Sequence, residues 1–127
     1  MKGYSFTAPA SPYSPQVSIT DVEARIVFTR LGDAVRIAGL ADLGNTDRRI
    51  DPRRTDALVA SARECMPAAA AFQQASAFWT GLRPMTPDAQ PRINRPHPRV
   101  AYNLGHGMLG WTLAMGSAER LARLVRA

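Results

Sequence analysis

The sequence predicts an α+β fold in which helices pack on an antiparallel sheet, and three patterns support this prediction. An alternating segment from Val22 to Phe28 is followed by a glycine turn and a second apolar segment that ends near residue 40. Apolar residues recur at helical spacing over 52–66 and again over 111–126. Alternation with a period of two indicates half-buried strands, whereas a spacing of three to four residues indicates amphipathic helices.

The hairpin at 22–40 is the clearest element of the predicted sheet. We expect one face of its first strand to be buried, and that face carries Val22, Ala24, Ile26 and Phe28. Gly32 supplies a residue able to take positive φ in the turn, and Val35 and Ile37 then point inward from the returning strand. Two further extended segments precede the hairpin, at 2–8 and 17–20, with three prolines between them over 9–15.

The helix expected at 52–66 has clear signals at both ends. Asp51 is a suitable N-cap, Pro52 suits the first helical position, and Pro67 ends the pattern. The expected buried face consists of Leu58, Val59, Ala62, Cys65 and Met66. Residues 68–75 are compatible with either an extension of the helix or a linker.

The C-terminal part is expected to contain three strands, a glycine loop and a helix. A strand is expected over 77–84, and Pro84 keeps Arg83 out of helical geometry. Residues 87–98 hold four prolines and suggest a loop with a short strand at 92–94, followed by a short buried strand at 100–104. The glycine loop at 105–110 leads into a helix at 111–126, whose inward side carries Leu113, Ser117, Leu121 and Leu124.

Composition suggests one domain of residues 1–127 in a reducing, cytoplasmic compartment. The chain has 127 residues, 46% of them hydrophobic, and its one cysteine excludes an intrachain disulfide. No apolar segment approaches the roughly 20 residues of a membrane span. The formal charge of +6 comes from arginines scattered over every segment, so we expect no nucleic-acid partner. Two histidines and one cysteine, far apart in the sequence, suggest no metal site.

Arg83 is a candidate binding residue because its guanidinium lies in an apolar, aromatic segment. Such a group is costly to bury unless it meets an anion, and a carboxylate fits the guanidinium in bidentate fashion. That carboxylate could belong to a ligand. The alternative is a structural ion pair with a nearby acid such as Asp88.

The glycine loop has the spacing G-x-G-x-x-G at Gly105, Gly107 and Gly110, which is typical of a dinucleotide-binding turn. That use requires a second parallel strand and an acidic residue further along, and neither follows in this sequence. A helix N-terminus also suits an anion or a negative charge that develops during a reaction. The alternative is a tight turn into a packed helix. His106 could be catalytic, but no catalytic residue is assigned from the sequence.

Two motifs together carry a resemblance to a known family. The segment Phe78-Trp79-Thr80-Gly81-Leu82-Arg83-Pro84-Met85-Thr86-Pro87-Asp88 and the segment Gly105-His106-Gly107-Met108-Leu109-Gly110-Trp111-Thr112 resemble the C-terminal region of FAD-dependent D-amino-acid dehydrogenases, in the D-amino-acid oxidase and glycine oxidase group. The likeness extends to Lys2-Gly3-Tyr4-Ser5 and to the hairpin that ends at Asp33. It thus covers nearly the whole chain.

The resemblance implies specific roles for these residues. Arg83 would bind the α-carboxylate of a D-amino acid. Gly105, His106, Gly107, Met108, Leu109, Gly110, Trp111 and Thr112 would lie against the flavin ring, with backbone amides near its N1 and O2 edge. The implied reaction is hydride transfer from the substrate α-carbon to flavin N5, hydrolysis of the imino acid to a keto acid and ammonia, and electron transfer to a respiratory acceptor. Residues 1–127 would represent part of the substrate domain, and residues 100–127 the segment that contacts the flavin.

Departures from the family pattern lead to two hypotheses. Nothing in residues 1–44 resembles the N-terminal fingerprint that holds the FAD pyrophosphate, so we expect FAD in a complete enzyme but not on this chain alone. Ala89 and Asn94 stand where the family usually has glycines, which predicts an altered loop. The chain is then either part of an active flavoenzyme, completed by a separate FAD-binding chain and peripheral to the inner membrane, or a catalytically silent remnant. Because the strand at 100–104 and the last helix have apolar faces, self-association into a dimer is also expected.

Overall fold

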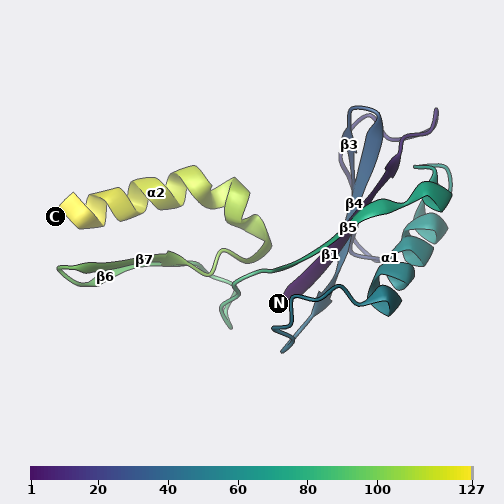
Figure 1. The fold of residues 1–127 in the computed structure, drawn as a ribbon. Coiled ribbons are helices and arrows are strands. Elements are labelled where there is room, and N and C mark those ends of the chain that lie inside the picture. The colour runs from purple at the N-terminus through teal and green to yellow at the C-terminus, as the bar shows by residue number, and fades with distance from the viewer. Residues whose placement is uncertain (127) are drawn as a thin grey trace. The chain divides into compact units, whose positions relative to one another are not determined.

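The computed structural model describes residues 1–126 and divides the chain into two compact units (Figure 1). The sheet unit is Lys2–Leu82, and the C-terminal unit consists of Met1 and the residues from Arg83 onward. The expected single domain of residues 1–127 stays a prediction. The α+β class predicted from the sequence is confirmed, since both sheets are antiparallel and are accompanied by helices.

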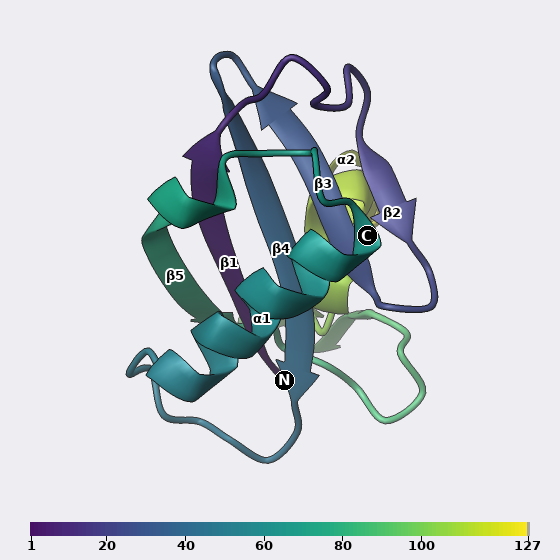
Figure 2. The same cartoon turned by 90° about the vertical axis from the view of Figure 1, so that its right-hand side faces the viewer.

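The sheet unit holds a five-stranded antiparallel sheet in the order β2-β3-β4-β1-β5. Its strands are β1 (Lys2–Pro9), β2 (Ile19–Asp21), β3 (Ile26–Leu31), β4 (Ala34–Asp42) and β5 (Ser76–Leu82). The helix α1 (Pro52–Cys65) crosses one face of the sheet (Figure 2), and the short helix η1 (Phe72–Gln74) precedes β5. The core lies between α1 and the sheet, and its largest fully buried apolar side chains are Tyr4, Phe6, Phe28, Ile26, Ile37, Leu58 and Val35.

The hairpin of β3 and β4 is confirmed, with the expected turn at Gly32 and Asp33, but its start at residue 22 is wrong. Asp21 of β2 pairs with Ile26 of β3, so residues 22–25 must form the turn between these strands. The Asp21 carboxylate accepts the Ala24 N–H at 2.7 Å and holds that turn. Val22 and Ala24 are therefore exposed, contrary to the alternation of the sequence.

The helix expected at 52–66 is confirmed as α1, including its cap. The Asp51 side chain accepts the Arg53 N–H at 3.0 Å, and Pro52 begins the helix. Leu58 and Ala62 are fully buried as expected, and Thr55 joins them. Burial of Cys65 is wrong: Cys65 is the last residue of α1 and is exposed, because no further helical turn follows to cover it.

The C-terminal unit consists of a two-stranded sheet with a helix packed along it (Figure 1). Its elements are β6 (Arg92–His97), β7 (Val100–Leu104), the short helix η2 (Gly107–Leu109) and α2 (Gly110–Arg126). The expected strand at 92–94 continues to His97, past Pro96, because the β6–β7 register shifts there and the strand lies at a sheet edge. The strand at 100–104 exists, but all of its residues are exposed, so its expected burial is wrong.

Arg95 of β6 ties this small sheet to the end of α2. Its guanidinium donates to the carbonyl oxygens of Leu124 at 3.2 Å and Val125 at 3.1 Å, and also to that of Pro98 at 2.9 Å. The last carbonyl groups of a helix have no hydrogen-bond partner within the helix, and the Arg95 guanidinium supplies one. Its positive charge also suits the negative end of the helix dipole. The inward side of α2 is as expected: Ser117 is buried, and Leu113, Leu121 and Leu124 are half-buried.

Among residues 1–126, no helix has the length and apolarity needed to cross a membrane.

Candidate functional site

The C-terminal unit brings the two motifs of the sequence together. The Gly107 N–H donates to the Pro84 carbonyl at 2.9 Å, and Met85 and His106 form an antiparallel bridge. Residues 84–86 and 105–107 thus run side by side, although about 20 residues separate them in the sequence. The residue immediately before this contact is Arg83. The pairing is long-range, so no local pattern in the sequence could reveal it.

Arg83 is held by its backbone, whereas its charge has no acidic partner in residues 1–126. Its N–H donates to the Met1 carbonyl at 2.7 Å, and its carbonyl accepts from the Met1 amine at 3.0 Å. The side chain is half-buried, and no ion pair with it is found in the described residues. A fixed backbone with an unneutralised guanidinium is a suitable arrangement for receiving a carboxylate.

The expected alternative, an ion pair between Arg83 and Asp88, is wrong. Asp88 pairs instead with Arg92, with a distance of 2.9 Å between Nη2 and Oδ2. The Asp88 carboxylate also accepts the Gln90 N–H at 3.2 Å, and this hydrogen bond, followed by that from Arg92, lowers the pKa of Asp88 below its ordinary value. The contacts of Asp88 with Gln90 and Arg92 need only a tight turn over a few residues. An ion pair between Asp88 and Arg83 would instead need the chain to fold back toward Arg83. The turn also places Ala89 at φ 56°, a conformation that glycine adopts more readily.

Two of the loop glycines are explained by close packing within the unit. Gly105 has φ 82° and Gly107 has φ 56°, both in the left-handed region. A Cβ at Gly105 would lie 2.7 Å from Thr86 Cγ2, and one at Gly107 would lie 2.5 Å from Met85 Sδ. These glycines therefore let the loop approach residues 85 and 86. Gly110 differs, since a Cβ there would meet only His106 Cβ at 3.6 Å.

The backbone N–H of His106 points away from this contact. His106 bridges Met85 while the Gly107 N–H donates to the Pro84 carbonyl, and in an antiparallel pair successive N–H groups point to opposite sides. Within residues 1–126, the His106 N–H donates no hydrogen bond to the backbone. The His106 side chain adds a polar atom, Nε2, which is buried without a hydrogen-bond partner in the described residues. No pattern in the sequence indicates that this nitrogen is orphaned.

The start of α2 and the short helix before it have an apolar surface. Trp111 is 95% exposed and Met108 is 71% exposed, and Leu109 and Met115 are exposed as well. The C-terminal unit carries seven arginines against two acids over residues 83–126, whereas the sheet unit carries nine basic residues against eight acids over 2–82. The exposed Trp111 ring, the outward N–H of His106, a helix N-terminus and the positive net charge of the unit are compatible with a planar, anionic cofactor such as FAD.

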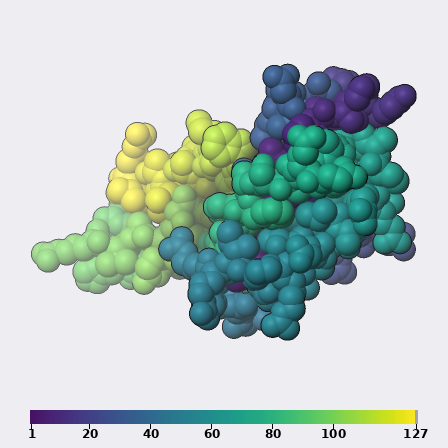
Figure 3. Space-filling view, turned by 45° about the vertical axis from the view of Figure 1, so that its right-hand side comes forward, coloured from purple at the N-terminus to yellow at the C-terminus, as the bar shows by residue number. Residues whose placement is uncertain are grey.

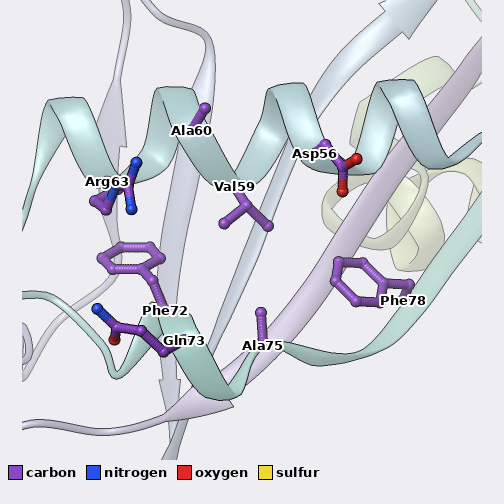
Figure 4. A pocket seen from close by; sticks show the side chains of 8 residues that line it. All are labelled: Asp56, Val59, Ala60, Arg63, Phe72, Gln73, Ala75 and Phe78. Carbon is purple, nitrogen blue, oxygen red and sulfur yellow. The ribbon is translucent and has the colours of Figure 1, made fainter.

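The sheet unit contains a hollow of about 290 Å³. It lies between α1, η1 and the first half of β5 (Figure 4). The space-filling view shows the surface of α1 (Figure 3). The hollow is lined by Asp56, Val59, Ala60, Arg63, Phe72, Gln73, Ala75 and Phe78. None of the site residues expected from the sequence lines it. Within residues 1–126, no cluster of His, Cys, Asp and Glu could hold a metal ion.

The class of protein follows from comparison with known families. The family model of the FAD dependent oxidoreductases (DAO) matches residues 1–124, and the chain belongs to this family. The resemblance found in the sequence is therefore confirmed at the level of the family.

Curated relatives are named as D-amino acid dehydrogenases. One from Rhodopseudomonas palustris is 42% identical over 122 residues, which are 94% of this chain and 28% of the relative. One from Paramagnetospirillum magneticum is 42% identical over 127 residues, which are 98% of this chain and 30% of the relative. The chain thus spans about 30% of the length of the relatives it matches.

Solved structures agree with the fold. Glycine oxidase from Geobacillus kaustophilus matches 98% of this chain and 34% of its own chain, with a TM-score of 0.83 and 25% identity. Glycine oxidase from Bacillus cereus matches with a TM-score of 0.76 at 19% identity, which supports the fold alone.

Proposed function

We propose that this chain supplies the substrate-binding arginine and the flavin-facing loop of an FAD-dependent D-amino acid dehydrogenase. The observation that carries the proposal is the hydrogen bond from the Gly107 N–H to the Pro84 carbonyl, 2.9 Å long, which brings the segment of Arg83 to the glycine loop. The names of the relatives give the substrate class, since both proteins cited above are D-amino acid dehydrogenases.

Arg83 is the residue that binds the substrate α-carboxylate. Its guanidinium has no acidic partner in residues 1–126, so a carboxylate would not have to displace an existing ion pair. Two parallel N–H···O bonds would fix the plane of the carboxylate and with it the direction of the Cα–H bond. This is a positioning role, which lowers the barrier by orienting the reacting atoms and involves no proton transfer by Arg83.

Residues Gly105 to Thr112 form the wall that faces the flavin ring. When bound, FAD supplies the redox chemistry by accepting a hydride from the substrate α-carbon. The outward N–H group of His106, together with the positive end of α2, would stabilise negative charge that develops beside them. Trp111 and Leu109 would exclude water from the same region, because they are the exposed apolar side chains at the start of α2.

The remaining part of the cofactor site comes from outside this sequence. The relatives are about three times as long as the matched segment. We infer that a nucleotide-binding portion, on a separate FAD-binding chain or on a longer form of this one, holds the rest of FAD, and that residues 1–127 do not retain FAD alone. Cytoplasmic location, with the complete enzyme peripheral to the inner membrane, belongs to the same proposal.

A chimera tests the function directly. This chain would replace the 122 residues that it matches in the D-amino acid dehydrogenase of Rhodopseudomonas palustris. The expected chimera retains flavin absorbance after desalting and reduces an artificial electron acceptor when a D-amino acid is added. A folded, flavin-loaded chimera without turnover would contradict the proposal.

The alternative function is a catalytically silent, folded remnant that self-associates. It is favoured by the short match to the relatives, since the segment covers only 28% to 30% of them. The same chimera separates the two hypotheses. A silent remnant would give a folded chimera that lacks activity, whatever the oligomeric state of the isolated chain.

A further inference from the structure

His106 is the only residue of the glycine loop at 105–110 with a nitrogen in its side chain. The ring nitrogen Nε2 is buried and has no hydrogen-bond partner within residues 1–126. These residues already cover the atom, so a group from outside them cannot reach Nε2 without displacing that cover. The missing hydrogen bond therefore has to be explained by the state of the ring itself.

The other ring nitrogen of His106, Nδ1, retains access to solvent. It has no hydrogen-bond partner in residues 1–126 either, but it is not one of their buried, unpartnered atoms. An uncharged imidazole carries one proton, so one nitrogen is a donor and the other is an acceptor. Buried backbone N–H groups without a partner are rarer in proteins than buried acceptors without one, and we apply the same asymmetry to the ring. Burial of Nε2 therefore favours the tautomer with its proton on Nδ1.

His97 has the opposite arrangement and serves as an internal comparison. Its Nδ1 accepts the Arg99 N–H at 3.2 Å, in the turn between β6 and β7. A nitrogen that accepts a hydrogen bond carries no proton, so the proton of an uncharged His97 lies on Nε2. The two histidines of the chain are therefore expected in different tautomers.

His106 presents two hydrogen-bond donors to its surroundings. Its carbonyl is engaged by the Leu109 N–H at 3.0 Å. Its backbone N–H points away from residues 84–86 and donates no hydrogen bond to the backbone of residues 1–126. The Nδ1–H group is the second donor of the same residue. A ligand atom that meets this surface must therefore be an acceptor, such as a carbonyl or carboxylate oxygen.

We propose that the Nδ1–H group of His106, together with its backbone N–H, donates to a carbonyl oxygen at the N1 and O2 edge of the flavin ring. The inference rests on the proposed function, in which residues 105–112 face that ring. Seven arginines against two acids over residues 83–126 favour an acceptor with negative charge. Hydrogen bonds strengthen when the acceptor becomes charged, so both donors favour the reduced flavin. The proton stays on Nδ1, and His106 transfers none.

The tautomer is measured on the full chain alone, without flavin. Long-range proton–nitrogen couplings in protein labelled with 15N-histidine, recorded in alkaline buffer, identify the protonated ring nitrogen. We expect Nδ1–H at His106 and Nε2–H at His97. His97→Gln assigns the signals, because one histidine then remains. A proton on Nε2 of His106 would overturn the proposal, whatever the complete enzyme does.

The midpoint potential of the flavin in the chimera tests the partner of the Nδ1–H group. His106→Phe keeps a ring without a donor, whereas His106→Asn places an amide N–H near the position of Nδ1. We expect His106→Phe to lower the ratio of reduced to oxidised flavin at least tenfold at a given potential, a shift of about 30 mV for a two-electron couple. His106→Asn should stay close to the unsubstituted chimera. Equal potentials in His106→Phe and the unsubstituted chimera would overturn the proposal.

The α-carboxylate of the substrate offers the same acceptor chemistry, and KM for the D-amino acid separates the two partners. A raised KM with an unchanged potential in His106→Phe would assign the donor to the substrate and would overturn the flavin contact. A chimera that retains no flavin would contradict the proposed function and with it the partner of His106. The tautomer would still be decided by the measurement on the chain alone.

Discussion

Replacing Gly107 by alanine should loosen the contact between the glycine loop and the segment after Arg83. Gly107 has φ 56°, and an L-residue in the left-handed region costs roughly 1–2 kcal/mol. The new Cβ would also lie 2.5 Å from Met85 Sδ, so the methionine must move, at a further cost of about 1 kcal/mol. The free energy of local opening should therefore fall by roughly 2–3 kcal/mol in total.

Hydrogen exchange of the amide at position 107 measures this opening, because that amide is bonded to the Pro84 carbonyl. Gly110→Ala is the matched control: Gly110 has φ −54° and its Cβ would make only an ordinary contact at 3.6 Å. We expect Gly110→Ala to leave exchange at residue 107 unchanged or slightly slower. Equal exchange rates in the two variants would refute the account of the loop.

Four further outcomes follow from single contacts. Arg95→Met removes three hydrogen bonds to carbonyls and should lower the stability of the C-terminal unit by about 1–3 kcal/mol in urea unfolding; unchanged unfolding would argue against the role of Arg95 at the end of α2. Phe28→Ala empties a fully buried site and should cost about 3–5 kcal/mol in the sheet unit, and a loss below 1 kcal/mol would contradict its burial. Ala89→Gly relieves φ 56° and should raise the melting temperature, and a decrease would count against strain there. The pKa of Asp88 is lowered from 3.8, so its turn is stabilised above that pH and loses this stabilisation as the pH falls through the lower folded value. The protection of the Gln90 amide, relative to its intrinsic exchange rate, should decrease there in the wild type but not in Asp88→Asn, and the same profile in both would contradict the assignment.

Local patterns identified most of the elements but not all of their boundaries. The cap at Asp51, the turn at Gly32 and the helix over 111–126 depend on neighbouring residues and were predicted correctly. Val22 continues the alternation of β3, yet it lies in a turn because the position of β2 decides where β3 begins. Pairing between strands is a tertiary property, so alternation alone does not locate the end of a strand.

The roles of the site residues stay a prediction, and the geometry around these residues could not be derived from the sequence. The family motifs singled out Arg83 and the glycine loop, and the fold brings their segments together through Pro84 and Gly107. The role of Gly105 and Gly107 in packing on Thr86 and Met85 depends on a contact across about 20 residues, which no spacing rule contains. Exposure of the strand at 100–104 was also missed, because an apolar segment indicates burial without saying what covers it.

The most direct test of the central claim is the kinetic effect of Arg83→Lys in the chimeric D-amino acid dehydrogenase. Lysine keeps the charge but loses the bidentate fork, so KM for the D-amino acid should rise at least tenfold while flavin content stays the same. Arg99→Lys, an exposed position in the turn between β6 and β7, is the control and should leave KM unchanged. An unchanged KM in Arg83→Lys would show that Arg83 does not bind the substrate carboxylate.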